Sequence, residues 1–198
     1  MRYPKSILIG SIIILAVTLL VVSGNSQSIH TQGGKYETYK NEEFGISFSY
    51  PSSWTEEPDP NEGILVIFYA PLQDDSDIFA ENFNVAIEEL SSSSYPLDVY
   101  SDNALDQLKS SFQNFRMEHL NANSSLSDYP AYYIDYTYTT PTAQGIMKLK
   151  NLQIWTMVDD KAYTFTFGAQ PLEFESYIPT IEKVIDSIEI NPTESKDD

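Results

Sequence analysis

The chain contains no cysteine among its 198 residues. Disulfide bonds, thiolate nucleophiles, cysteine-bound zinc and acylated-cysteine lipid anchors are therefore excluded. Basic residues are also scarce, because 11 Lys and Arg stand against 29 Asp and Glu. Two of the basic residues, Arg2 and Lys5, precede the apolar run at residues 7–22, and all 29 acids follow it, so the chain beyond that run carries 9 − 29 = −20 charges. Such a charge repels nucleic acid and anionic lipid and attracts cations or basic partners, and it also keeps an exposed protein soluble.

Histidine is nearly absent, with only His30 and His119 in the chain. A Ser–His–Asp hydrolase would need His119 as its base, because His30 lies in a polar, glycine-containing stretch. No G-x-S-x-G elbow is present to hold a nucleophile, and a lone strand histidine is most often a surface or partly packed residue. An envelope hydrolase is therefore the least favoured functional class.

Long apolar runs are limited to one segment, residues 7–22, which carries no charge. Sixteen helical residues span about 24 Å, somewhat less than the roughly 30 Å hydrocarbon core of a bilayer. The segment is either a cleaved signal peptide or an uncleaved anchor, and its length favours the anchor. Because Arg2 and Lys5 precede it, the positive-inside rule places the C-terminal part of the chain outside the cytoplasm in both cases. We expect a single-pass membrane protein with an extracytoplasmic C-terminal domain, or a secreted one if the segment is cleaved.

The composition divides the chain into four parts. Residues 1–24 form the anchor or signal peptide, and residues 25–35 are a polar, glycine-containing linker. The domain occupies residues 36–190, and residues 191–198 are a charged tail that opens near a proline.

Within the domain, the period of the apolar residues predicts both strands and helices. Alternation of Ile46, Phe48 and Tyr50 predicts a strand that ends at Pro51, with Trp54 folding back onto the core. Apolar residues at intervals of three and four predict two amphipathic helices, at residues 97–115 and from about Pro179 onwards. Residues 56–62 are predicted to be an exposed acidic loop around Pro58 and Pro60. Further strands are predicted at residues 63–70, 82–90, 116–126, 129–140, 146–158 and 161–169.

Most of the links between these strands are too short for parallel crossovers. We therefore expect an α+β fold with a largely antiparallel sheet of six or so strands. The two amphipathic helices must each bury an apolar stripe, so one is expected on each face of the sheet.

The order of these elements, with the prolines and glycines that separate them, resembles that of the PsbP-like family. Tyr39, Phe44-Gly45, Tyr50-Pro51 and Trp54 carry the most specific part of the resemblance. The stretches that carry it are YKNEEFGISFSYPSSW, YPLDVYSDNALDQLKSSFQNF, YPAYYIDYTYT and FESYIPTIEKVIDSIEI. The resemblance implies an α/β/α sandwich. Family members in plants and cyanobacteria are accessory proteins of photosystem II, whereas other prokaryotic members are extracytoplasmic and have no assigned role. The membrane segment points to the latter branch, and no catalytic motif is carried over.

The best candidate for a metal site is the run Asp74, Asp75 and Asp77 with Glu81 nearby. Hard cations such as Ca²⁺ bind six to eight oxygens, and clustered carboxylates supply several of them. The spacing is not that of an EF-hand loop, so a solvated acidic loop without metal is the alternative interpretation. Separately, Asn123-Ser124-Ser125 is an N-glycosylation sequon on the exported side.

Together these observations predict a membrane-tethered accessory domain that binds an unknown protein partner and has no catalytic activity, no nucleic-acid ligand and no obligatory cofactor. The alternative is a low-affinity Ca²⁺- or Mn²⁺-binding protein that uses the 74–81 loop.

Overall fold

The computed structural model describes residues 35–191 except 62, 75–76, 91–94 and 144, and leaves the side chains of 59–61 aside. The predicted membrane segment, the linker as far as residue 34 and the tail from residue 192 lie outside this range. Within the described residues, no helix is both long and apolar enough to cross a membrane.

The described chain forms strands and helices in the order predicted, with two strands added at the ends of the domain and one where a loop was expected. The first half comprises β1 (Tyr36–Asn41), β2 (Ile46–Pro51), β3 (Thr55–Asn61), β4 (Ile64–Tyr69), β5 (Asn82–Glu89) and α1 (Leu97–Ser111). The second half comprises β6 (Gln113–Leu126), β7 (Tyr129–Thr142), β8 (Gly145–Val158), β9 (Lys161–Ala169), α2 (Phe174–Asp186) and β10 (Glu189–Ile190).

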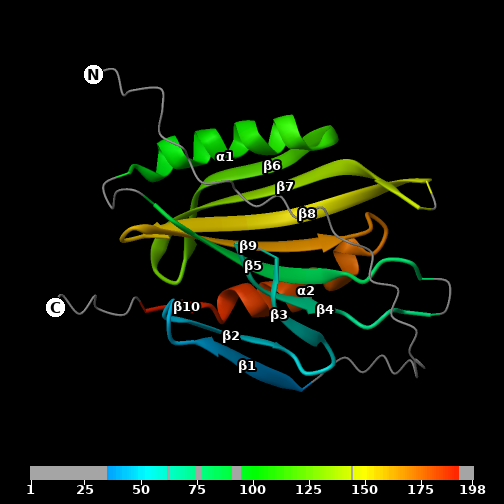
Figure 1. Ribbon diagram of the computed structural model, residues 1–198, viewed down its shortest axis with the longest axis horizontal. Helices are drawn as coiled ribbons and strands as arrows, with labels where there is room; N and C mark the ends of the chain where they lie inside the picture. Colours follow the sequence, from blue (N-terminus) through cyan, green and yellow to red (C-terminus); the bar gives the residue numbers. More distant parts are fainter. Residues whose placement is uncertain (1–34, 62, 75–76, 91–94, 144, 192–198) are drawn as a thin grey trace.

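Two antiparallel sheets and two helices build the domain in layers (Figure 1). The larger sheet has seven strands in the order β3-β4-β5-β9-β8-β7-β6, and the smaller has three in the order β1-β2-β10. Helix α1 covers one face of the large sheet, while α2 and the small sheet lie on the other face. The expected antiparallel sheet with helices on both faces is therefore confirmed.

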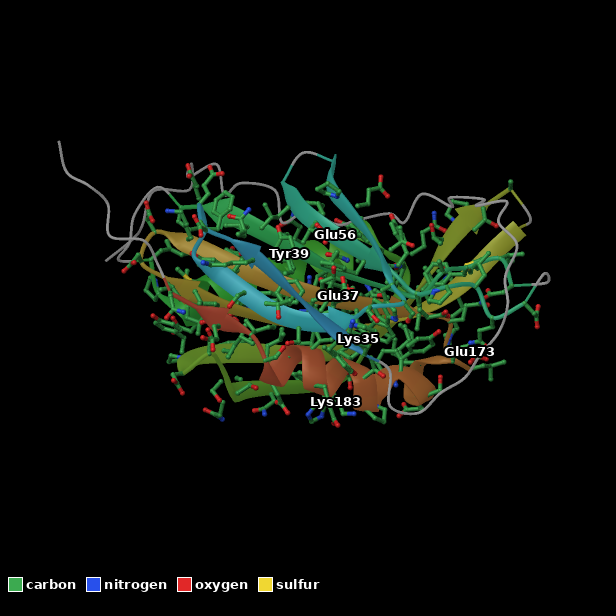
Figure 2. All side chains as sticks on the ribbon, turned by 90° about the horizontal axis from the view of Figure 1, so that it is seen from below. Lys35, Glu37, Tyr39, Glu56, Glu173 and Lys183 are labelled. Atoms are coloured by element: carbon green, nitrogen blue, oxygen red, sulfur yellow. The ribbon has the colours of Figure 1, made fainter. Side chains whose placement is uncertain are left out.

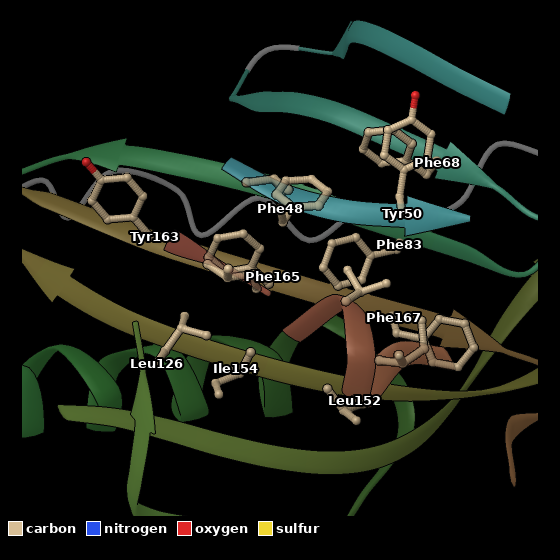
Figure 3. Packing of buried hydrophobic residues seen from close by; sticks show 14 of the residues in the cluster. Phe48, Tyr50, Phe68, Phe83, Leu126, Leu152, Ile154, Tyr163, Phe165 and Phe167 are labelled. Atoms are coloured by element: carbon tan, nitrogen blue, oxygen red, sulfur yellow. The ribbon is translucent and has the colours of Figure 1, made fainter. Parts of the chain in front are cut away.

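The core on the α2 side is dominated by aromatic rings from both sheets (Figure 3). Phe48 of the small sheet packs against Phe68, Phe83 and Phe165 of the large one, with ring centroids 5.6 to 6.3 Å apart. These rings are 0–1% exposed, as the predicted alternation along β2 and β9 requires. Trp54 is also buried here, which confirms that it folds back onto the core.

The core on the α1 side includes a fully buried polar contact between α1 and β8. The indole N–H of Trp155 on β8 donates a 2.8 Å hydrogen bond to Ser101 Oγ on α1, and the Ser101 hydroxyl donates to the Leu97 carbonyl at 2.7 Å. Ser101 is 0% and Trp155 1% exposed. The even-numbered residues of β7, Tyr132 to Tyr138, face this same core, as their alternation predicted.

Four details of the prediction are wrong. The opening strand β2 lies in the small sheet, because it pairs with β1 and β10 and not with the large sheet. Residues 55–61 form an edge strand, not a loop, and the Pro58 ring is tolerated there because an edge strand has one unpaired side.

The other two errors concern helix limits. Helix α1 ends at Ser111. Phe115, the last residue of the predicted stripe, lies on β6 instead, where it packs against the core on the α1 side. Helix α2 starts at Phe174 and continues through Pro179. Burial of Phe174 (2% exposed) holds the first turn in place, and this outweighs the one backbone hydrogen bond that proline removes.

Replacing Ser101 by Ala should lower the free energy of unfolding by about 1–3 kcal/mol, because the buried Trp155 N–H loses its acceptor. Ser110→Ala is the matched control, since Ser110 is exposed on the same helix and its hydroxyl bonds only the Gln107 carbonyl. Urea unfolding followed by far-ultraviolet circular dichroism measures both. Equal stability of the two variants would show that the Ser101–Trp155 bond contributes nothing.

Candidate functional site

Three connections lie at one end of the large sheet, the right-hand end in Figure 1. They are the link from β4 to β5, the link from β9 to α2, and the β7–β8 hairpin. The strand register places them at the same end, because Asn82 at the start of β5 pairs with Gly168, and Ala169 pairs with Lys150 of β8. The β7–β8 hairpin extends beyond Lys150 as far as the pair of Thr142 with Gly145. We call this surface the loop end and define it as the described residues of 70–81, 141–147 and 170–175.

Asp77 organises the link between β4 and β5. Its carboxylate accepts the backbone N–H of Gln73 at 2.9 Å and that of Phe79 at 3.0 Å. Its own N–H donates to the Asp74 carbonyl at 3.1 Å. These bonds turn the chain so that Phe79, only 3% exposed, enters the core on the α1 side. Asp77 therefore has a structural role whether or not it binds a ligand.

Glu81 is a buried carboxylate with few partners. It is 1% exposed, its Oε1 lies 3.5 Å from the Gln170 backbone N–H, and its Oε2 has no hydrogen-bond partner among the described residues. Burial away from water, with smaller contributions from the nearby carboxylates of Asp77 and Glu173, raises the pKa of Glu81 to about 7. The interpretation of this residue as part of a solvated loop is therefore wrong.

The start of α2 brings further polar groups to Glu81. Gln73 Nε2 donates a 2.8 Å hydrogen bond to Glu173 Oε2, which links the two connections. Figure 2 shows Glu173 at the beginning of α2, with Lys183 further along the same helix. Burial, with smaller contributions from the carboxylates of Glu81 and Asp77, raises the pKa of Tyr177 to about 12. Sequence reasoning missed Gln73, Glu173 and Tyr177 because they lie on segments about 90 to 100 residues apart.

A row of buried polar side chains continues from Glu81 into the large sheet. The register places Asn82 of β5, Gly168 of β9 and Asn151 of β8 side by side. Asn151 donates to the Tyr136 hydroxyl at 3.1 Å, and its Oδ1 lacks a partner in the described structure. A Cβ at position 168 would lie 3.1 Å from that oxygen, so glycine allows the close approach. The loop end is thus backed by polar groups and not by a purely apolar core.

Exposed apolar side chains also occur at this end of the sheet. Leu172 is 94%, Ile146 77% and Ile78 47% exposed, and each lies on a different connection of the loop end. Each of these side chains is accessible for contact with another molecule.

The structure describes three of the four predicted metal ligands. Asp74, Asp77 and Glu81 all lie at the loop end, whereas Asp75 lies outside the described residues. Among the residues that the structure does describe, no group of three or more His, Asp or Glu side chains is arranged to hold a metal ion. The metal site stays a prediction.

The other predicted residues lie away from the loop end. His119 is exposed on the edge strand β6, where its ring lies 5.9 Å from that of Tyr133 and its backbone pairs with Asp135. Asn123 is exposed on the same strand, so its predicted glycosylation stays a prediction. Asp159 and Asp160 form the tight turn between β8 and β9, and Asp159 takes a left-handed φ of 54°.

Comparison with known proteins agrees with the fold. The PsbP family profile matches residues 34–190. The chain therefore belongs to the PsbP family. A search of curated proteins finds no match.

Several solved structures share the fold at low identity. Cyanobacterial PsbP (CyanoP) from Synechocystis superposes with a TM-score of 0.61 at 17% identity, covering 85% of this chain and 99% of its own. PA94 from Pseudomonas aeruginosa, a protein of unknown function, gives 0.57 at 16%, covering 81% and 100%. LpqN of Mycobacterium tuberculosis, involved in cell envelope biogenesis, gives 0.55 at 11%, covering 81% and 88%. At these identities the likeness shows the fold alone.

The raised pKa of Glu81 makes stability depend on pH. The folded state holds its proton up to about pH 7, whereas the unfolded chain releases it near pH 4.5, so the free energy of unfolding falls as pH rises between these values. Glu81→Gln removes this charge. It should be more stable than the parent by about 3 kcal/mol at pH 8 and nearly equal to it at pH 4.5.

Urea unfolding across this pH range, with a chelator present, measures the difference. The control is Glu43→Gln, because Glu43 is exposed in the β1–β2 turn and should behave like the parent at every pH. A stability gain for Glu81→Gln that does not change with pH would contradict the buried-carboxylate interpretation.

Proposed function

We propose that this protein is a non-catalytic accessory domain, tethered to the membrane outside the cytoplasm, which binds a partner protein through its loop end. The observation that carries the proposal is the high exposure of two apolar side chains, Leu172 (94%) and Ile146 (77%), in connections at one end of the large sheet. Membership of the PsbP family supports an accessory role.

The arrangement of the titratable groups supports a role without catalysis. Tyrosines with raised pKa, such as Tyr100 and Tyr136, are 1–2% exposed and pack in the core below α1. His119 is exposed on an edge strand, and its described contacts are with β7. A buried acid with no histidine among its described neighbours suits binding better than acid–base chemistry.

The membrane tether is supported by the charge-free run at residues 7–22, which Arg2 and Lys5 precede. The fold neighbour LpqN acts in cell envelope biogenesis, which agrees with an extracytoplasmic address for this fold.

Protease added to intact cells tests this address. We expect a C-terminally tagged chain to be digested in intact cells, because the domain lies beyond the membrane, while a cytoplasmic marker stays whole. A tagged domain that survives until the cells are lysed would refute the proposed location.

A second candidate function is binding of a divalent cation at the loop end, and Glu81 favours it. Its buried Oε2 lacks a partner, and the carboxylates of Asp77 and Glu173 lie nearby. A bound cation would offset the repulsion between these carboxylates. Their oxygens are ligands of the kind that Ca²⁺ and Mn²⁺ bind.

Calorimetric titration of the full chain in detergent with Ca²⁺ and with Mn²⁺ tests this function. Glu81→Gln should weaken binding at least about tenfold, the usual effect of removing a charged ligand, whereas Glu43→Gln should bind as the parent does. Equal heats for the parent and Glu81→Gln would exclude Glu81 as a ligand.

A further inference from the structure

We propose that residues 27–32, which precede the described domain, add to the outer edge of β1 as a further antiparallel strand, through a two-residue turn at Gly33-Gly34. The strand that fills this edge would therefore come from the chain itself. The inference goes beyond the proposed function, because it concerns the linker and the small sheet and requires neither a partner protein nor a bound cation.

Among the described strands, β1 has the most regular unpaired edge. It is the terminal strand of the small sheet, at the lower margin of the molecule in Figure 1, and its six residues pair with β2 without a register shift. The edge strands of the large sheet differ, because β3 contains Pro58 and one register shift and β6 has three register shifts against β7. Prolines and bulges hinder further pairing, whereas a regular edge presents N–H and C=O groups to a new strand.

The sequence before β1 has the features of the other half of a hairpin. Gly-Gly is one of the dipeptides that form two-residue hairpin turns, because such turns require a positive φ. The described structure begins at Lys35, directly after this dipeptide. A turn at Gly33-Gly34 fixes the register, and the resulting pairs are Gln32 with Lys35, Thr31 with Tyr36, His30 with Glu37 and Ile29 with Thr38. Ile29 and Thr31 are β-branched, which suits a strand.

This register brings the histidine of the linker to two carboxylates that share one hydroxyl group. Tyr50 of β2 pairs with Glu37, and its hydroxyl oxygen lies 3.4 Å from Glu37 Oε2 and 3.3 Å from Glu56 Oε2 of β3. Figure 2 labels both carboxylates on this side of the domain. One hydroxyl hydrogen cannot serve both carboxylates at once. His30 would lie opposite Glu37 on the same face of the sheet, where an imidazole N–H supplies a further donor.

Strand addition would shorten the tether to the membrane. If residues 7–22 cross the bilayer as proposed, a free linker of residues 23–34 reaches about 40 Å when extended. With residues 27–34 folded onto β1, only residues 23–26 stay extended, a reach of about 14 Å. The domain would then be held close to the bilayer. This consequence alone rests on the proposed tether.

Paired cysteines test the strand in the full-length chain in detergent, because the chain has no cysteine of its own. The test pair is Ile29→Cys with Thr38→Cys. Opposite residues of antiparallel strands have Cα atoms about 4.5–5.5 Å apart, which a disulfide can span. The control pair is Ile29→Cys with Ser52→Cys. Ser52 is exposed like Thr38, and its backbone N–H donates to the Lys35 carbonyl at 2.8 Å, so a free linker would reach both positions.

Both pairs are equilibrated in the same glutathione buffer, and the oxidised fraction is measured by mass spectrometry of the peptides. We expect the effective concentration of the 29–38 pair to exceed that of the 29–52 pair at least about tenfold, because a flexible linker brings its ends together less often than an ordered strand pair does. Glu37→Gln should lower the value for 29–38 about two- to fivefold, since it removes the charged partner of His30. Glu43→Gln, in the exposed β1–β2 turn, should leave it unchanged.

A variant of the turn completes the test. Gly34→Val should remove most of the difference between the two cysteine pairs, because a β-branched residue resists a positive φ. Equal effective concentrations for the two pairs in the otherwise unchanged chain would overturn the proposal, as would a 29–38 disulfide that Gly34→Val leaves unaffected. Neither result bears on the accessory function proposed for the loop end, so the two proposals fail separately.

Discussion

The structure depends on the contact of Phe48 with the aromatic rings of the large sheet. This ring, on the central strand of the small sheet, packs 5.1 to 6.3 Å from the rings of Tyr39, Phe68, Phe83 and Phe165. Because β2 also pairs with β1 and β10, the same contact attaches both ends of the described domain to its centre. Aromatic rings at these separations add favourable electrostatic geometry to the burial of a large apolar area.

The loop end is built differently from this core. Its segments are joined by single polar contacts, such as the bond between Gln73 and Glu173, and it contains a carboxylate that burial disfavours. Proteins tolerate such a cost where the group serves a purpose other than stability, and functional sites are the usual place for shifted pKa values. Rigid packing elsewhere allows this end to carry both an unpaired carboxylate oxygen and exposed apolar tips. The contrast between the two regions is the physical basis for proposing that the loop end is the functional site.

Much of the fold could be predicted because the spacing of apolar residues and the prolines and glycines that end elements are local features of the sequence. Alternation along β2, β7 and β9 placed Phe48, Tyr136 and Phe165 in the core, and all three are buried. Errors arose where a distant contact outweighed a local preference. Phe174 is buried against Phe167, which starts α2 five residues before Pro179. Residues 55–61 become a strand because β4 offers a partner, although their own composition favours a loop.

The candidate site was only partly predictable. The sequence placed Asp74, Asp77 and Glu81 on one acidic connection, but composition suggested that water surrounds them all. Glu81 is buried because residues 170–177 pack near it. No local sequence pattern predicts this long-range contact.

By itself, therefore, the sequence determined the charge of the chain, the apolar N-terminal segment, the family and the alternation that builds both cores. Only the tertiary structure decided which strands share a sheet, which carboxylate is desolvated and which apolar side chains stay exposed together. The reason is that period and charge are properties of neighbouring residues. Desolvation, in contrast, depends on which distant segments pack against a given side chain.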